Sequence, residues 1–348
     1  MPTSIIILSL LAILGLRDSY LLAQEEPRSY ISYRTDEIIT VDGLANEKAW
    51  QKAEWSSDFI DIEGERIPKY STKVKMIWDD IHLHFYAEMQ EPHLWGTLKE
   101  RDTVIFYNND FEIFIDPDGD THNYMEFEMN VLNTVWDLIL TKPYRNQGNI
   151  LDFWDMKGLK SAVHMNGTLN DAGDTDKGWS VEISIPWKVM AEGYHGTIPP
   201  KDEFWRINFS RVNWQFDLEE NHYVRKRKTD GTFEPEYNWV WSPQHVINMH
   251  EPERWGYVYF STDNASNQKF SIPDDEYLKW YMYEVYRKVR ENKGDFEGNP
   301  SPPKIIKGKP IEIKYDKHLV GFTIYTKSPF SGNLLTIDAD GKFDSHEQ

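Results

Sequence analysis

The stretch DFEIFIDPDGDTHNYMEFEMN, residues 110–130, decides the fold of this chain. Along residues 124–130 apolar and polar side chains alternate, so that Met125, Phe127 and Met129 share one face and polar groups line the other. This period of two is typical of a β-strand, whose successive side chains point to opposite faces. Residues 117–120 read PDGD, a turn sequence. The stretch therefore predicts two strands that have an apolar face and a face carrying carboxylates.

Short strands separated by turn residues continue on both sides, with little helical periodicity between residues 38 and 260. About nine strands are expected, at residues 72–77, 81–88, 111–116, 124–130, 135–140, 161–165, 179–185, 206–212 and 254–260. Strands at this spacing indicate an antiparallel β-sandwich. We therefore predict an all-β fold in which residues 30–262 form the sandwich.

The composition of the chain changes after residue 260. Residues 261–268 are polar like a linker, and residues 273–293 have the periodicity of an amphipathic helix. The Gly and Pro residues of 298–303 end this helix, and two or three short strands follow. We expect residues 263–348 to form a C-terminal helix plus short strands, as either an appendage of the sandwich or a small α+β unit.

The N-terminus contains the apolar run IIILSLLAILGL at residues 5–16. The run is too short to span a bilayer, which takes about 20 residues, and it is typical of the hydrophobic part of a signal peptide. We predict a signal peptide over residues 1–23, cleaved after Ala23, and an exported protein in the periplasm, at the cell surface or in the medium. An uncleaved anchor is the alternative, because no Lys or Arg precedes the run.

Composition excludes several classes of function. The chain of 348 residues has 38 basic and 57 acidic side chains, a net charge of −19. Nucleic acid and anionic membranes are therefore not expected as partners, since binding them takes clustered basic groups. The absence of cysteine excludes disulfides, a lipoprotein anchor and c-type haem attachment, and no haem is expected. By contrast, 14 Trp, 19 Tyr and 17 Phe exceed what a core needs and indicate stacking surfaces.

Five landmarks in the sequence resemble a family 9 carbohydrate-binding module. They are VDG at 41–43 followed by NEKAW at 46–50, WDD at 78–80 with LHF at 83–85, DFEIFID at 110–116, WSVEISIPW at 179–187 and WG at 255–256. The similarity covers about residues 38–260, in the family's order. It implies a β-sandwich that binds sugars, often with structural calcium and without catalysis of its own. The remaining segments look like a larger exported bacterial subgroup associated with polysaccharide breakdown.

The resemblance also implies where a sugar binds. Glu112 matches the family's acidic residue, which accepts hydrogen bonds from sugar hydroxyls. The family holds the sugar between two Trp rings, but here Phe106 or Tyr107 stands at the first position and His250, beside Met249, near the second. The chain therefore departs from the family's pair of tryptophans and from the preference for sugar ends that goes with it.

Further binding groups are expected from the residues themselves. Glu126, Glu128 and Asn130 form a polar stripe, and an acid at Glu128 in place of the family's basic group favours another hydroxyl pattern or a cation. Arg206 or Arg211 could supply opposite charge, because a basic group in an apolar strand needs a partner. The residues predicted to bind the ligand are Phe106, Tyr107, Glu112, Glu126, Glu128, Asn130, Trp136, Arg211, Trp241 and His250.

Two acidic loops are candidate calcium sites. The first contains Asp116, Asp118 and Asp120 around a glycine, and the second contains Asp171, Asp174 and Asp176. Calcium prefers six to eight oxygen ligands of this kind. The alternative for both loops is an ordinary turn. We predict calcium at the first loop as a structural ion.

These observations predict a non-catalytic protein that binds a neutral mono- or oligosaccharide on an aromatic and carboxylate face. Its role would lie in extracellular polysaccharide degradation, with glycan-degrading enzymes as partners. Two alternatives stay open. Glu112, Glu126 and Glu128 could serve a glycoside hydrolase, which needs two carboxyls about 5 to 10 Å apart. The chain could also be a protein-interaction module of a glycan-processing assembly.

Overall fold

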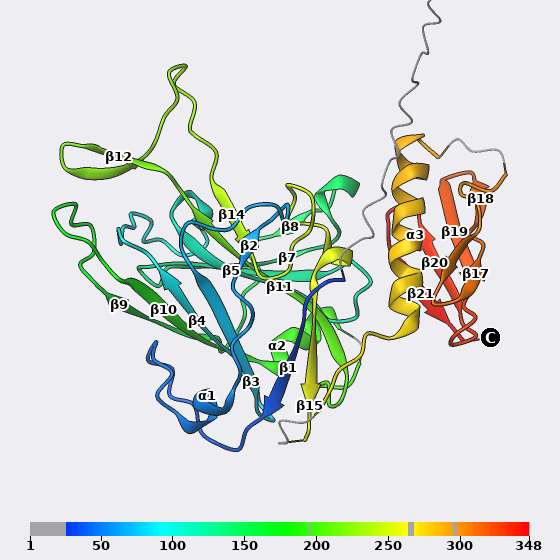
Figure 1. Cartoon of the computed structure of the whole chain (residues 1–348), viewed down its shortest axis with the longest axis horizontal. Coiled ribbons are helices and arrows are strands. Elements are labelled where there is room, and N and C mark those ends of the chain that lie inside the picture. The colour runs from blue at the N-terminus through cyan, green and yellow to red at the C-terminus, as the bar shows by residue number, and fades with distance from the viewer. Residues whose placement is uncertain (1–25, 195, 264–267, 295–297, 348) are drawn as a thin grey trace, which may run out of the picture.

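The computed structural model describes residues 26–194, 196–263, 268–294 and 298–347, so the predicted signal peptide lies outside the described residues. The main body of the described chain is built on one sheet of 13 strands (Figure 1). Its order is β8-β7-β6-β5-β11-β15-β1-β3-β4-β10-β9, with β14 attached to β11 and β2 attached to β14. The bounds are β1 Ser29–Arg34, β2 Ile60–Asp61, β3 Thr72–Trp78, β4 His82–Gln90, β5 Asp110–Asp116, β6 Tyr124–Asn130, β7 Val135–Leu140, β8 Ile150–Leu151, β9 Lys160–Asn166, β10 Gly178–Pro186, β11 Phe204–Asn213, β14 Tyr237–Val240 and β15 Gly256–Ser261.

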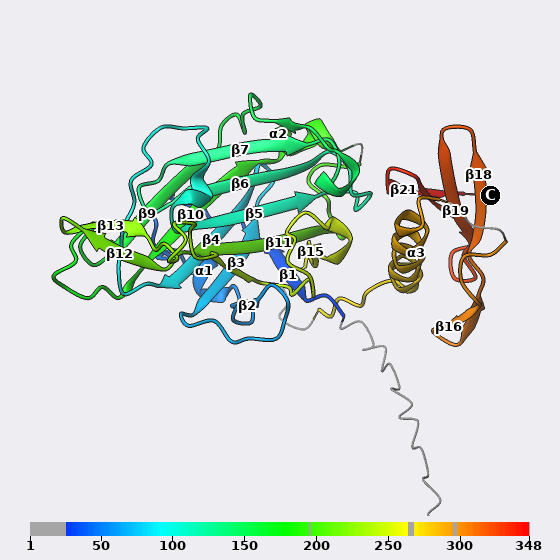
Figure 2. The ribbon, with the colours of Figure 1, turned by 90° about the horizontal axis from the view of Figure 1, so that it is seen from above.

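The large sheet curls so that its two halves share one core. Figure 2 shows β7, β6, β5 and β11 side by side, and their apolar faces pack against those of β3, β4 and β10. Phe209 on β11 illustrates the contact, because its ring centroid lies 5.9 Å from that of Phe111 on β5 and 5.7 Å from that of Phe85 on β4. The predicted apolar face of residues 125–129 is part of this core. The opposite face of β5 and β6 is therefore free for other groups.

The predicted all-β fold is confirmed, and each predicted sandwich strand has a counterpart in the sheet. The sheet is mixed rather than wholly antiparallel, because β1 runs parallel to both β15 and β3. We did not predict β1 from the sequence, since SYISYR has few aliphatic residues and no recognisable hairpin partner nearby. A separate hairpin of β12 (Phe216–Glu219) and β13 (His222–Arg225) was also not predicted.

The described C-terminal residues form a small α+β unit. Helix α3 (Asp274–Glu291) lies between the main body and a four-stranded sheet (Figure 1). The unit's strands are β16 Lys304–Ile306, β17 Lys309–Ile311, β18 Lys314–His318, β19 Gly321–Lys327, β20 Leu334–Asp338 and β21 Phe343–His346. Met282, Val285 and Val289 of α3 pack on Ile324 and Ile337 in a core of their own. None of the helices among the described residues has the length and apolarity needed to cross a bilayer.

Short helical segments connect the strands, and three of the 3-10 helices carry residues of the candidate site. They are α1 Lys48–Lys52, α2 Trp187–Met190, η1 Ile105–Tyr107, η2 Tyr144–Asn146, η3 Ala191–Gly193 and η4 Pro252–Arg254.

Candidate functional site

The outer face of β5 and β6 carries four carboxylates. Asp110 and Glu112 lie on β5, and Glu126 and Glu128 lie on β6, each alternating with residues of the core. We call these four residues the carboxylate cluster. All four are at most 5% exposed, and Glu112 lies directly opposite Glu128 in the strand register. Like charges placed opposite each other destabilise a sheet, so the sequence retains this arrangement at a cost in stability.

The electrostatics of the carboxylate cluster favour protonation or a bound partner. Burial raises the pKa of all four carboxyls, and it raises the pKa of Glu112 to about 7. Two backbone amides partly compensate, because Val212 N–H donates to Asp110 at 3.2 Å and Phe106 N–H donates to Glu128 at 3.0 Å. The charged neighbours that act on the cluster are themselves acids. The face can thus accept hydrogen bonds from hydroxyl groups or ligate a cation.

Aromatic groups border the carboxylate cluster beside η1. Phe106 and Tyr107 contact each other with ring centroids 4.9 Å apart, and Tyr107 is 46% exposed. Trp214 fixes the turn by donating its indole N–H to the carbonyl of Phe106 at 2.7 Å. The guanidinium of Arg225 lies 4.5 Å from the centroid of the Tyr107 ring. The two predicted aromatic residues are therefore held at this border, and one presents an open ring.

A second aromatic border is formed by His250 and Tyr144. Their ring centroids lie 4.3 Å apart, edge to face, and His250 Nδ1 lies 3.0 Å from the hydroxyl of Tyr124. Burial lowers the pKa of His250 to about 3, so its imidazole is neutral at pH 7. Tyr144 is 44% exposed, and burial together with Glu126 and Glu128 raises the pKa of its phenol. Tyr144 thus belongs to the site, although we did not predict it from the sequence.

Two polar groups face the carboxylate cluster from neighbouring strands. Trp136 on β7 is opposite Glu128, and Ser210 on β11 is opposite Glu112. Both side chains are at least nine-tenths buried. The indole N–H has no hydrogen-bond partner, and the serine hydroxyl accepts no hydrogen bond but lies near enough to Glu112 to lower the pKa of that carboxyl. Because unpaired buried polar groups cost free energy, they are candidate contacts for a bound ligand.

The structure does not bring two of the predicted residues, Arg211 and Trp241, to the carboxylate cluster. Arg211 leaves the opposite face of β11 and pairs with Glu91 at 3.0 Å. Trp241 is buried in the main core against Phe209. A third predicted residue, Asn130 at the end of β6, lies opposite Asp110 in the strand register, but its side-chain amide bonds the backbone of the adjoining loops. Each of these side chains is engaged by the protein itself.

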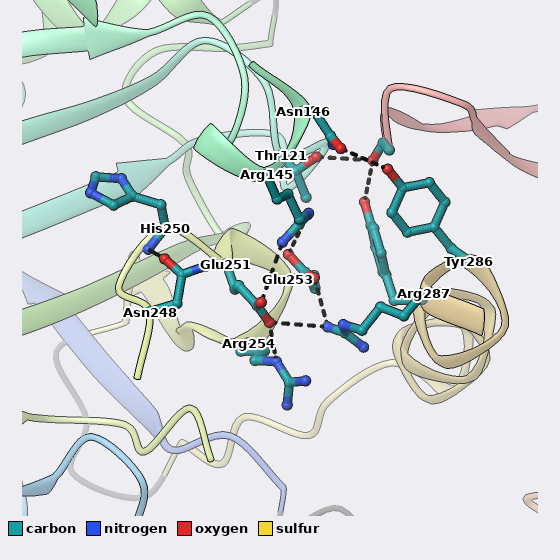
Figure 3. A network of polar contacts seen from close by, with 12 residues as sticks. Thr121, Arg145, Asn146, Asn248, His250, Glu251, Glu253, Arg254, Tyr286 and Arg287 are labelled. Atoms are coloured by element: carbon teal, nitrogen blue, oxygen red, sulfur yellow. Dashed lines mark hydrogen bonds and ion pairs between the residues drawn. The ribbon is translucent and has the colours of Figure 1, made fainter. Parts of the chain in front are cut away.

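The C-terminal unit makes ion pairs and hydrogen bonds with the two loops that carry the second aromatic border, as Figure 3 shows. Arg145 directly follows Tyr144 and pairs with Glu253 of η4 at 3.0 Å. Glu253 also pairs with Arg287 of α3 at 2.6 Å. Burial favours protonation of Glu253, but Arg145, Arg287 and Arg254 outweigh it and lower the pKa of Glu253 to about 2. Helix α3 is therefore ionically tied to the loops that carry Tyr144 and His250.

The predicted calcium loops are occupied by the protein's own groups. Both carboxylate oxygens of Asp116 accept backbone N–H groups of the turn at 3.0 Å. Lys342 pairs with Asp120 at 3.2 Å, and the ammonium of Lys279 donates to a carbonyl of the same turn. In the second loop, Asp176 also accepts two backbone N–H groups. Lys279 and Lys342 bring positive charge to the first loop, whose three aspartates still lie close enough together to share an ion. Calcium there stays a prediction.

Comparison with known proteins identifies the class of this domain. Residues 41–202 match the model of the family described as carbohydrate family 9 binding domain-like. The match covers slightly less than half of the chain and shows a domain like the family 9 carbohydrate-binding modules at these residues, so the resemblance read from the sequence is confirmed. The matched region includes the whole carboxylate cluster. A search of curated proteins gives no significant match.

Solved structures with the same fold are distant in sequence. A Bacteroides uniformis protein whose carbohydrate-binding assignment is itself provisional is 14% identical, has a TM-score of 0.50, and is matched over 68% of this chain and 100% of its own. A family 9 module from Caldicellulosiruptor kristjanssonii in complex with cellotriose is 15% identical over 71% of this chain and 100% of its own, with a TM-score of 0.44. A family 9 module from the same organism in complex with glucose is 16% identical over 68% of this chain and 100% of its own, with a TM-score of 0.43.

Proposed function

We propose that the chain binds a neutral mono- or oligosaccharide over the carboxylate cluster, between the borders formed by Tyr107 and by Tyr144 with His250. The observation that carries this proposal is a face of buried acceptors flanked by open aromatic rings. Sugar hydroxyls donate well to carboxylates, and the C–H faces of a pyranose stack on aromatic rings. The match of the domain to a carbohydrate-binding family supports the same conclusion.

Isothermal titration calorimetry of the purified protein tests the proposal. The panel includes glucose, cello-oligosaccharides and other neutral sugars, each titrated with EDTA or with calcium. We expect saturable binding of at least one sugar and no released product. The absence of heat with every sugar would overturn the proposal. New reducing ends would instead favour the hydrolase alternative. Glu112, whose pKa is raised, could then act as the general acid.

Replacing Glu112 with Ala is expected to weaken sugar binding at least about tenfold, because a charged acceptor for hydroxyls is lost. The fold should persist, since the change removes one of several repelling carboxylates. Glu88→Ala is the matched control, because this strand glutamate is exposed on β4. Equal affinities for the two variants, measured by calorimetry, would remove Glu112 from the site.

Replacing Tyr144 with Ala is expected to weaken the same sugar about three- to tenfold, the usual contribution of one aromatic stacking contact. Tyr325→Ala, in the C-terminal sheet, controls for the loss of a tyrosine elsewhere. Fluorescence or calorimetric titration measures both variants. An effect of similar size in both would mean that Tyr144 acts through general stability rather than through contact with the sugar.

The wider role is part of the same proposal. An exported sugar-binding domain would serve extracellular polysaccharide degradation by holding glycan near enzymes that cleave it. Sequencing the N-terminus of protein recovered from the producing cell tests export, with Gln24 expected as the first residue. Co-purification with glycan-degrading enzymes, lost upon washing with the bound sugar, tests the partnership.

A further inference from the structure

The carboxylate cluster differs from the other acidic clusters of the described chain. Four groups of three side chains have ligand atoms within 4.8 Å of one another. Arg101 pairs with one of these groups, Lys342 pairs with a second, and the third contains two histidines. The fourth, Asp110, Glu112 and Glu128, has only acids as charged neighbours. Buried charges in proteins are normally paired or coordinate metal ions, so this group lacks an expected partner.

The spacing of these three carboxylates suits a cation. Calcium binds oxygen at 2.3–2.6 Å, and two ligands on opposite sides of the ion therefore lie about 5 Å apart. One oxygen each of Asp110, Glu112 and Glu128 lies within 4.8 Å of the others. All three oxygens can therefore contact a single ion without a change in the strands.

The backbone orients two of the carboxylates, and one oxygen of Asp110 stays without a partner. Val212 N–H bonds Asp110 Oδ1, and Asp110 Oδ2 is buried without any partner. Phe106 N–H bonds Glu128 Oε2 in the same way. Hydrogen bonds that fix the outer oxygen of a carboxylate are the usual support of a metal ligand.

An independent group points at the same place. Ser210 pairs with Glu112 across β11 and β5, so its side chain leaves the same face of the sheet. Its hydroxyl is 1% exposed and lies near enough to Glu112 to lower the pKa of that carboxyl, while its oxygen accepts no hydrogen bond. A hydroxyl oxygen is a ligand that hard cations accept, and a bound ion would satisfy this oxygen.

We propose that Asp110, Glu112 and Glu128, together with the hydroxyl of Ser210, bind a hard divalent cation such as calcium. An oxygen-only set of ligands selects calcium, magnesium or manganese over softer metals. The ion would neutralise part of the charge of the carboxylate cluster. It would also turn a face that accepts hydrogen bonds into one that can coordinate sugar hydroxyls. The ion site shares residues with the proposed sugar site, but it does not depend on sugar binding.

Metal binding is tested on the whole protein without sugar. After treatment with EDTA and its removal, calcium chloride, magnesium chloride and manganese chloride are titrated by calorimetry. We expect one ion per chain for at least one metal. Asp110→Asn and Glu128→Gln should each weaken it at least about tenfold, because one anionic ligand is lost while the shape is kept. No metal-dependent heat in the unmodified protein would overturn the proposal.

Controls separate this site from the turn after β5 and from unfolding. Asp118→Asn, in the predicted calcium turn, should leave the affinity unchanged; loss of binding there but not in Asp110→Asn would place the ion in the turn and overturn the proposal. Terbium emission excited through tryptophan gives a second readout, and calcium should quench it by displacement. Circular dichroism verifies that each variant folds. Sugar titrations with and without the metal then show whether sugar binding and metal binding can be lost independently of each other.

Discussion

Replacing Arg206 with Met is expected to lower the free energy of unfolding by about 3–5 kcal/mol, because it leaves buried partners without their charge. Arg206 is 1% exposed and lies on β11, where its guanidinium bonds the carbonyl of Trp255 at 3.1 Å and the hydroxyl of Tyr257 at 2.9 Å. It also pairs with Glu276 of α3 at 3.2 Å. Urea unfolding followed by tryptophan fluorescence measures the loss.

The matched control is Arg211→Met, which removes the other fully buried arginine of β11. Arg211 pairs with Glu91 inside the sandwich and does not contact α3. Both variants should destabilise the sandwich, but only Arg206→Met should release the C-terminal unit. Trypsin cleavage at the exposed Lys269, which precedes α3, reports that release. Faster cleavage in Arg211→Met as well would show that cleavage follows general destabilisation of the sandwich rather than loss of the contact between Arg206 and α3.

The stability of the protein should fall between pH 6.5 and pH 5 through His250. Burial holds the pKa of His250 at about 3, whereas the unfolded chain titrates near 6.5, so in this range the unfolded state binds more protons. Stability contributed by the neutral imidazole is complete above pH 6.5 and is lost as the pH falls. At pH 5 the penalty reaches about 2 kcal/mol.

His250→Asn tests this prediction, because an amide can still accept the hydrogen bond of Tyr124 but does not titrate. The variant should lose less stability than the unmodified protein between pH 7.5 and pH 5, as measured by urea unfolding in EDTA. The carboxylate cluster acts in the opposite direction, since raised pKa values favour the folded state as the pH falls. That contribution is common to both proteins and cancels in the comparison. Parallel pH profiles would contradict the buried neutral imidazole.

Local alternation predicted the strands and the side of the sheet on which each residue lies. Met125, Phe127 and Met129 are in the core, and Glu126 and Glu128 are on the other face, as a period of two requires. Alternation fails for β1, whose two neighbours in the sheet lie far away in the sequence. Its parallel pairing depends on tertiary contacts that no local pattern encodes.

The candidate site was predictable only where it follows the strands. Asp110 lies at the start of β5, the strand that carries Glu112, and is a ligand of the proposed cation site. The sequence alone offered no reason to assign it a role. Tyr144 carries no landmark motif in the sequence, and its contact with His250 shows its position. Arg211 needed a buried partner, as predicted, but the partner is Glu91, which lies about 120 residues earlier in the chain. Pairings of this kind cannot be read from composition or spacing.

The position of β1 has a consequence for the order in which the domain forms. Ser29 pairs with Tyr257 and Tyr33 pairs with Ser261, so the first strand of the sheet needs the last strand of the sandwich as its neighbour. A ribosome has therefore released nearly the whole domain before the two halves can join. Such long-range pairing raises the contact order and slows folding. The local hairpins can form during synthesis, but the seam between β1 and β15 closes only at its end.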